Sequence, residues 1–187
     1  MIWPFNRKTS TETGAEYYIR DAAIADAKTL VDFKHRIWRD MFGHLKDEAF
    51  FTQAEATTDE QVKFWQSRIS RGDTVWMAED LRDRLVGTLH ATTKHSEHTA
   101  EFVAAHALGE LHELRYFYLT AATAETTIGT ELIRTAIGDQ PAITWLMGHA
   151  PLVETNLRQA GFEPLGEPID PSDAPWKGIP RQAMVRQ

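Results

Sequence analysis

One acidic side chain stands inside a strongly aromatic segment of the chain. Glu113 belongs to the run Leu111–Leu119, LHELRYFYL, and this composition is typical of a central β-strand. Half burial in such a strand would raise the pKa of the Glu113 carboxyl group towards a value that suits general base catalysis. Two plainer interpretations stay open: the glutamate is solvated, or it is paired with Arg115 two residues along the strand.

The segment that follows this strand is a candidate anion site. Residues 124–129 span the start of an apolar helical pattern that runs from Ile128 to Gly138. A helix start presents free backbone N–H groups and the positive end of the helix dipole, and both attract phosphate. We therefore expect these residues to bind a phosphate-bearing ligand through backbone amides. The alternative is a plain strand–loop–helix connection in which Gly129 is selected for close packing.

A group of histidines raises the question of a metal site. Two of them, three residues apart, could share a helix face, but the segment 92–109 has the polarity of a surface loop. The chain has no cysteine, which excludes disulfides, thiolate zinc sites, iron–sulfur clusters and cysteine nucleophiles. We therefore predict no metal site. The histidines concerned are His90, His95, His98, His106 and His112.

Large aromatic residues gather in the first third of the chain, where helical periodicity is strong. Such a set is more typical of a hydrophobic core than of a ligand-binding box. Its members are Trp38, Phe42, Phe50, Phe51 and Trp65.

The elements that position these residues follow from hydrophobic periodicity and glycine stops. We expect four helices, over residues 24–42, 58–71, 128–137 and 152–160. We expect seven strands, over residues 17–20, 74–78, 85–89, 111–119, 142–147, from 162 onwards, and 182–186. Residues 1–15 are expected to form a flexible leader, and 43–58, 92–109 and 164–180 to form loops. The order predicts one α/β (α+β) domain over 16–187, with antiparallel strands early and a parallel β-α-β step late.

Length and charge narrow the function classes. The 187 residues suit one domain, and 20 basic against 27 acidic residues give a net charge of −7. This acidity argues against a nucleic-acid partner, because such proteins present a basic face. No stretch approaches 18 consecutive apolar residues, and the N-terminal apolar stretch is too short for a signal peptide. We therefore expect a cytoplasmic protein with no membrane partner.

The joint order of several short fragments resembles the GNAT superfamily of N-acetyltransferases over roughly residues 17–186. The fragments are Tyr18-Ile19-Arg20-Asp21-Ala22 with Asp26, Ile37-Trp38-Arg39, Val75-Trp76-Met77-Ala78-Glu79, Val86-Gly87, Glu113-Leu114 with Phe117-Tyr118-Leu119, Thr127-Ile128-Gly129-Thr130-Glu131-Leu132, Ala160-Gly161-Phe162 and Met184-Val185-Arg186. The resemblance implies a GNAT-like domain whose mixed sheet has about seven strands and about four helices.

The resemblance also implies acetyl-CoA as cosubstrate and assigns roles to residues. A bulged strand at Phe117, Tyr118 and Leu119 would bond the acyl-pantetheine arm through its backbone. The first two helices would roof the acceptor cleft, with Trp38 and Phe42 as substrate-binding residues. The pyrophosphate loop would comprise Ala124, Glu125, Thr126, Thr127, Ile128, Gly129 and Thr130.

The chain departs from the family pattern at several catalytic and binding positions. Ala124 stands at the Arg/Gln place of the loop, and Thr127 replaces the first glycine, where a β-branched side chain resists positive φ. Leu157 stands where the family has the tyrosine that protonates the leaving thiolate, and Ala150 stands where it has an asparagine. Tyr118 is the substitute proton donor that we assign, with Tyr116 as the alternative.

Three function classes remain after these departures. The leading hypothesis is an acyl-CoA-dependent N-acyltransferase in which the primary amine of a small molecule or peptide attacks the thioester directly, with Glu113 as base. The second is a catalytically impaired GNAT-fold module that binds acyl-CoA or regulates a partner. The third is a scaffold that uses the fold for subunit contacts alone. A homodimer is compatible with each of them.

Overall fold

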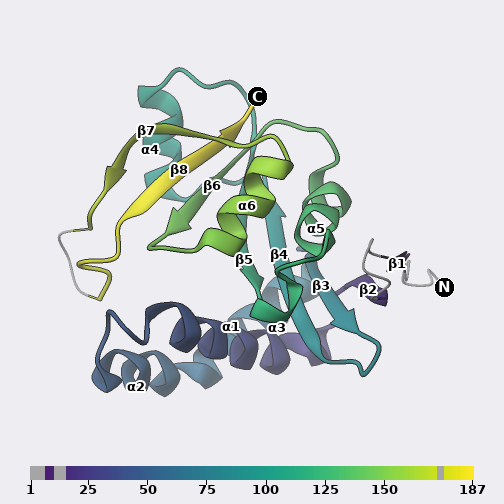
Figure 1. Ribbon diagram of the computed structural model, residues 1–187. Coiled ribbons are helices and arrows are strands. Elements are labelled where there is room, and N and C mark those ends of the chain that lie inside the picture. Colours follow the sequence, from purple (N-terminus) through teal and green to yellow (C-terminus); the bar gives the residue numbers. More distant parts are fainter. Residues whose placement is uncertain (1–6, 11–15, 172–174) are drawn as a thin grey trace.

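One eight-stranded mixed sheet, in the order β1-β2-β3-β4-β5-β6-β8-β7, runs through the molecule (Figure 1). The computed structural model describes residues 7–10, 16–171 and 175–187. The strands are β1 (Arg7–Ser10), β2 (Glu16–Asp21), β3 (Val75–Asp80), β4 (Leu85–Thr92), β5 (His112–Leu119), β6 (Ala142–Met147), β7 (Glu163–Ile169) and β8 (Arg181–Arg186). The α-helices are α1 (Ala27–Phe42), α2 (Glu48–Ala56), α3 (Thr58–Ser70), α4 (Glu97–Ala105), α5 (Ile128–Ile137) and α6 (Pro151–Gln159). Two short 3₁₀ turns, Ile24–Asp26 and Ala121–Thr123, precede α1 and α5.

One pair of neighbouring strands in the sheet is parallel, and the other pairs are antiparallel. Strands β2 to β5 pair antiparallel with their sequence neighbours, and β5 then pairs parallel with β6 across the crossover helix α5. Strand β8 returns between β6 and β7 and is antiparallel to both. The predicted combination of early antiparallel strands and a late parallel β-α-β step is therefore confirmed.

Helices cover both faces of the sheet, as alternate residues of β3 show. Ala78 packs in the core beneath α5 and α6, whereas Val75 and Met77 pack against α1 and α3 on the other face. Helix α4 covers β6 and β8 through Phe102, which packs on Ile143. Figure 1 shows α5 and α6 together over one face of the sheet, with α1, α2 and α3 grouped at one end of the molecule.

Two helices occupy segments that the sequence predicts as loops. Helix α2 begins after Asp47, whose side chain accepts a hydrogen bond from the Phe50 N–H, and α4 begins after Ser96, which caps the Thr99 N–H. Each helix has nine residues and buries only two of them, so neither presents a long apolar period. The described part of the chain thus holds six α-helices where about four were expected.

Strands also extend beyond the prediction. Residues 7–10, inside the segment 1–15 assigned to a flexible leader, form β1 and pair antiparallel with β2. The remainder of that leader lies outside the described residues. The sheet therefore has eight strands where about seven were expected. Of the helices that the structure describes, none has the length and apolar character needed to cross a bilayer.

Candidate functional site

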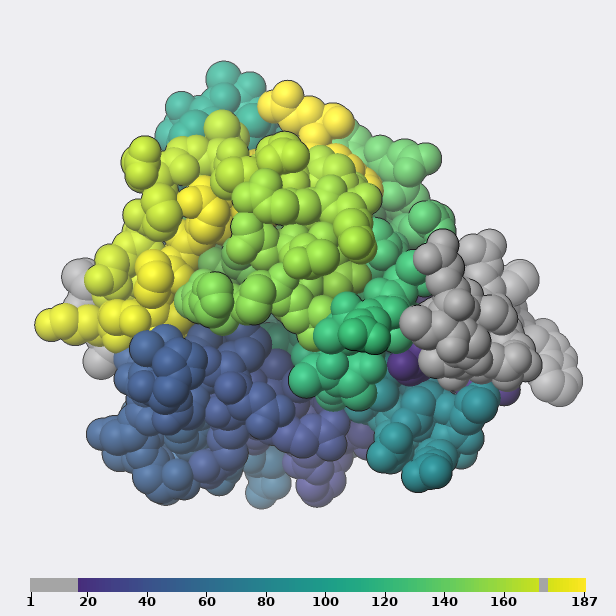
Figure 2. All heavy atoms as spheres, in the orientation of Figure 1, coloured from purple at the N-terminus to yellow at the C-terminus, as the bar shows by residue number. Residues whose placement is uncertain are grey.

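Strands β5 and β6 separate halfway along their length and leave a cavity between them. Their parallel pairing covers only His112–Leu114 opposite Ala142–Thr144, although β5 continues to Leu119 and β6 to Met147. The cavity has a volume of about 340 Å³. Its walls come from α1, β5, β6 and the starts of α4 and α6. They comprise Trp38, Met41, Phe42, Ser96, Glu113, Leu114, Arg115, Tyr116, Phe117, Tyr118, Thr144, Trp145, Leu146, Met147, Ala150 and Val153. In the space-filling view, the segment carrying α6, in lime, meets α1 and α2, in blue, along one seam (Figure 2).

Strand β5 carries a bulge beside this cavity. Tyr116 has a φ of 53°, which is unusual for a residue other than glycine, and the pairing with β4 shifts at this point. Thr88 pairs with Tyr118 while His90 pairs with Arg115, so β5 has one extra residue at the shift. The Thr88 hydroxyl donates a hydrogen bond of 2.9 Å to the Tyr116 carbonyl and so holds the bulge. The bulge implied by the family resemblance is therefore present, next to the backbone of Phe117.

Glu113 lies on the cavity wall, but its carboxylate is fully engaged. The side chain is 3% exposed. Oε2 accepts hydrogen bonds from the Ser96 N–H at 2.7 Å and from Arg115 at 2.6 Å. Oε1 accepts from the hydroxyls of Ser96 and Thr99, both at 2.9 Å. Two carboxylate oxygens offer about four acceptor positions, so this network fills them.

The expectation of a raised pKa at Glu113 is wrong. Burial by itself raises the pKa of this carboxyl, but the hydrogen bonds from Arg115, Ser96 and Thr99 and the charge of Arg115 together outweigh it, so the pKa lies below its ordinary value. The alternative that the sequence left open, a pair with Arg115, is confirmed. Because Ser96 is the N-cap of α4, Glu113 also ties the start of that helix to the sheet.

Tyr118 and Trp38 meet at the cavity wall where α1 approaches β5. The Trp38 indole N–H donates a hydrogen bond of 3.0 Å to the Tyr118 hydroxyl, which leaves the hydroxyl proton available to another acceptor. Burial raises the pKa of Tyr118 well above its usual range, with a smaller opposing effect of the Trp38 hydrogen bond. Tyr116 also lines the cavity and packs edge-on against Trp65, with ring centroids 4.7 Å apart. The structure thus brings Trp38, Phe42, Glu113 and Tyr118 together around one cavity, as the sequence predicted for a shared site.

The predicted phosphate loop lies between β5 and α5 with free backbone donors. In the part of the chain that the structure describes, the N–H groups of Thr127, Gly129 and Thr130 donate no hydrogen bond to the protein. Thr127 has a φ of −89°, which a β-branched residue adopts readily. The expected conflict between its side chain and a positive φ therefore does not arise. Ala124 and Glu125 are exposed, and neither supplies a side-chain donor. Anion binding at this loop would therefore depend on backbone amides, against the negative charge of Glu125.

Gly129 is also required for packing. A Cβ atom at this position would lie 2.4 Å from Asn156 Oδ1 and 2.8 Å from Leu119 Cδ1, so α5 approaches α6 and β5 closely only because the side chain is absent. The close-packing interpretation of Gly129 is thus confirmed, and it coexists with the free amides at the same turn.

Helix α6 lacks the tyrosine and the asparagine that the family pattern has in this region. Leu157, at the place of the family tyrosine, has no exposed surface and belongs to the core beneath α5. Ala150 lines the cavity at the start of the helix. Asn156 on the same helix is buried, and its Oδ1 has no hydrogen-bond partner in the described part of the chain.

The histidines predicted not to bind metal lie apart from one another. His95 precedes α4 and contacts the Leu111 carbonyl, so it shares no helix face with His98, whose ring lies 4.3 Å from that of Trp145. His90 is 1% exposed and packs between Trp65 and Tyr116. No group of three or more candidate ligands occurs among the residues that the structure describes.

Sequence reasoning missed part of the cavity wall and the second aromatic wall around Trp38. Met41 follows Trp38 by three residues on α1, so helical periodicity could have placed it in the cavity. Trp176 lies in the segment 164–180, predicted as a loop, yet its ring packs on Trp38 with centroids 4.8 Å apart. The sequence around Trp176 does not indicate this contact, because Trp38 lies on a helix far away in the chain.

The fold matches solved acetyltransferase structures. The chain is similar to the PaiA N-acetyltransferase of Thermoplasma acidophilum, solved with coenzyme A, at 14% identity and a TM-score of 0.61 over 91% of this chain and 98% of that one. It is similar to a GNAT-superfamily phosphinothricin acetyltransferase of Sinorhizobium meliloti, solved with acetyl-CoA, at 20% identity and a TM-score of 0.61 over 91% and 87% of the two chains. It is also similar to the ribosomal-protein-alanine N-acetyltransferase of Brucella melitensis, at 17% identity and a TM-score of 0.60 over 90% and 98%.

At the level of sequence, no protein-family model and no curated protein matches this chain. The structural likenesses show that it has the GNAT acetyltransferase fold, and the family resemblance is confirmed at that level.

Proposed function

We propose that this protein is an acyl-CoA-dependent N-acyltransferase that takes acetyl-CoA and transfers the acyl group to a primary amine of a small molecule or peptide. The observation that carries the proposal is the separation of β5 from β6 beside the bulge at Tyr116. It opens a cavity along β5, and the helix that follows β5 in the chain, α5, begins with free backbone amides. Such a site suits a long ligand with a polar linear arm and a phosphate group.

The residues present fit the phosphate-bearing part of acetyl-CoA, though with fewer donors than the family pattern supplies. The N–H groups of Thr127, Gly129 and Thr130 are unpaired and lie at the positive end of the α5 dipole. Arg115 lines the cavity rather than this loop, so no side-chain cation in the loop adds to these amides. We therefore expect binding that is weaker than an arginine-bearing loop would give.

The proposed chemistry is direct attack of the amine on the thioester carbonyl. The new C–N bond forms as the C–S bond breaks, the amine loses one proton, and the thiolate gains one. Backbone N–H groups of β5 that β6 no longer pairs would stabilise the negative charge that develops on the carbonyl oxygen. Tyr118 would donate a proton to the leaving sulfur, because its hydroxyl accepts from Trp38 and keeps its own proton free.

The geometry favours a structural role for Glu113 over the role of base. Its four acceptor positions are filled and its pKa is lowered, so it has little capacity to take a proton from an amine. We propose that Glu113 holds Arg115 and the start of α4 in place at the cavity wall. The amine proton would then pass to solvent, and Tyr118 would regain a proton from solvent after protonating the sulfur.

One observation favours a second candidate function. Leu157 buries a hydrocarbon side chain where the family has a proton donor, and the loop offers no side-chain cation. A protein with these features could bind acyl-CoA without turning it over. The two functions differ in thiol release: an acyltransferase frees CoA thiol from acetyl-CoA when a suitable amine is present, whereas a binding module does not. A panel of small amines and peptides tested by this assay separates them.

A further inference from the structure

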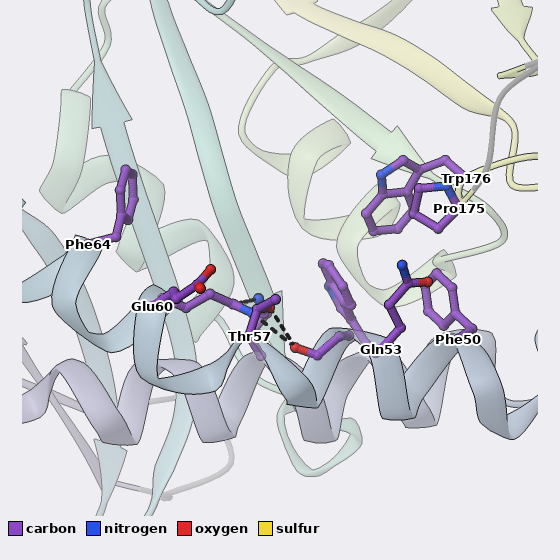
Figure 3. A pocket seen from close by; sticks show the side chains of 11 residues that line it. Phe50, Gln53, Thr57, Glu60, Phe64, Pro175 and Trp176 are labelled. Atoms are coloured by element: carbon purple, nitrogen blue, oxygen red, sulfur yellow. Dashed lines mark hydrogen bonds between the residues drawn. The ribbon is translucent and has the colours of Figure 1, made fainter.

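A second cavity adjoins the one between β5 and β6 and shares Trp38 with it. It has a volume of about 570 Å³ and lies between α1, α2, α3 and the segment at Pro175 (Figure 3). Phe50 and Trp176 stand at one end and Phe64 at the other, with Thr57 between them (Figure 3). Because Trp38 borders both cavities, a molecule held in the second one lies next to the proposed acyl-transfer site.

The apolar end of this cavity is a cluster of rings set edge to face. Trp38 and Trp176 meet at 86° with centroids 4.8 Å apart, and Phe50 meets Trp176 at 78° with centroids 5.7 Å apart. Edge-to-face packing fixes the orientation of the rings and leaves flat surfaces for a further ring or a large apolar group.

The floor of the cavity holds a buried cation without a counter-ion. Lys34 is 9% exposed, and its ammonium lies 4.6 Å from the centroid of the Trp38 ring. Its hydrogen-bond partner is the neutral Gln61 Oε1, and no described carboxylate forms an ion pair with it. Gln61 is itself oriented, because its amide donates to the Ala54 carbonyl and the Thr57 hydroxyl. Buried lysines are rarely left unpaired.

Other titratable groups near Lys34 do not neutralise it. His35, the next residue on α1, has a pKa lowered by burial and by the charge of Lys34, so it is neutral at physiological pH. Glu60 on α3 lines the cavity but is exposed and makes no ion pair with Lys34. Burial lowers the pKa of Lys34 to about 8, so the ammonium is still the main form at pH 7.

We propose that this second cavity binds the acceptor, and that the acceptor is an amine with an aromatic body and a carboxylate, the chemistry of an aromatic amino acid. Lys34 binds the carboxylate, the rings of Trp38, Phe50 and Trp176 hold the aromatic body, and the amine faces the shared wall. The assignment of this ligand as the acceptor rests on the proposed acyltransferase function. A single cation beside a neutral amide suits a carboxylate better than a phosphate, which recruits several donors.

Calorimetric titration without acetyl-CoA tests the ligand chemistry with three matched probes at pH 7. L-phenylalanine carries both groups, 3-phenylpropionate lacks the amine, and phenethylamine lacks the carboxylate. We expect the two carboxylates to bind at least tenfold more tightly than phenethylamine. Lys34→Met should remove this preference, while Lys34→Arg keeps most of it and Lys63→Met, on the exposed side of α3, changes none of the three affinities.

The pH dependence gives a readout that a loss of folding would not mimic. The affinity of 3-phenylpropionate should fall as the pH rises through about 8, because Lys34 then loses the proton that binds the carboxylate. The Lys34→Arg variant should show no such fall. Equal affinity for phenethylamine and 3-phenylpropionate, or an unchanged affinity for 3-phenylpropionate in a folded Lys34→Met variant, would overturn the proposal.

A parallel titration with acetyl-CoA separates this inference from the proposed function. If acetyl-CoA binds and the carboxylates do not, the substrate class is wrong and the acyltransferase proposal stands. If the carboxylates bind through Lys34 and acetyl-CoA does not, the acyltransferase proposal fails and the acceptor assignment fails with it.

Discussion

Replacing Glu113 by glutamine tests whether this carboxylate is a structural anchor or a base. The amide keeps one acceptor oxygen, which can face the Ser96 N–H and Arg115, while its NH₂ group can donate to the hydroxyls of Ser96 and Thr99. The shape and most hydrogen bonds are therefore kept, and the charge is lost.

The expected cost follows from the two bonds on Oε2. Hydrogen bonds to charged groups contribute roughly 1.5–3 kcal/mol and neutral ones roughly 1 kcal/mol, so the loss of charge from two bonds costs about 1–4 kcal/mol of unfolding free energy. Since the pKa of Glu113 is lowered in the folded state, this stability is present above the ordinary carboxyl pKa, about 4.3, and is lost as the pH falls below it. The difference between the wild type and Glu113→Gln should therefore shrink on acidification.

Urea denaturation at several pH values measures this difference, with Glu110→Gln, an exposed glutamate on the preceding loop, as the matched control. The control should change stability by less than about 0.5 kcal/mol. In the thiol-release assay we expect Glu113→Gln to lower kcat/KM by less than tenfold once the folded fraction is taken into account. A fall of about 10²–10⁴-fold with unchanged stability would refute the anchor role and identify Glu113 as the base.

The remaining predictions concern the proton donor and the phosphate loop. Tyr118→Phe should lower kcat by about 10²-fold with a smaller change in KM, in steady-state kinetics, because it removes the proposed donor to the leaving thiolate; an unchanged kcat would reject this role. Ala124→Arg should tighten CoA binding by roughly 1.5–3 kcal/mol in a calorimetric titration, since it adds a charge-assisted contact. Thr127→Gly should also tighten CoA binding by allowing closer approach of the phosphate to the amides. If neither substitution changes the affinity for CoA, the loop is not the CoA site. Gly129→Ala should destabilise the fold by about 1–3 kcal/mol in urea denaturation, because the added Cβ would overlap Asn156; full stability would contradict the close packing.

The long periodic elements of the fold follow from the sequence, because each combines an apolar period with a clear stop. The helix ending before Gly138 and the strand Ala142–Met147 match α5 and β6 at their boundaries. Helices α2 and α4 could not be predicted this way, since each buries two residues and depends on its contacts with distant parts of the chain.

The cavity was predictable in part. Trp38, Phe42 and Tyr118 line one cavity, and the family resemblance gives the arrangement of the elements around them; their roles stay predictions. The pKa of Glu113 could not be predicted from the sequence. It depends on Ser96 and Thr99, which precede the strand and whose position is set by α4. The partnership of Lys34 with Gln61 joins two helices and leaves no mark on local sequence.

Binding of acetyl-CoA to the folded protein is the most direct test of the central proposal, and thermal denaturation measures it. A ligand at a hundredfold excess over its Kd stabilises the folded state by about 2.7 kcal/mol, which raises the Tm of a domain of this size by about 5–11 °C. The proposal predicts a rise towards this range with acetyl-CoA and a large part of it with CoA. It predicts a much smaller rise in Val153→Phe, because that substitution adds bulk to the cavity wall at α6. An unchanged Tm with acetyl-CoA, longer acyl-CoAs and CoA at millimolar concentration would contradict it.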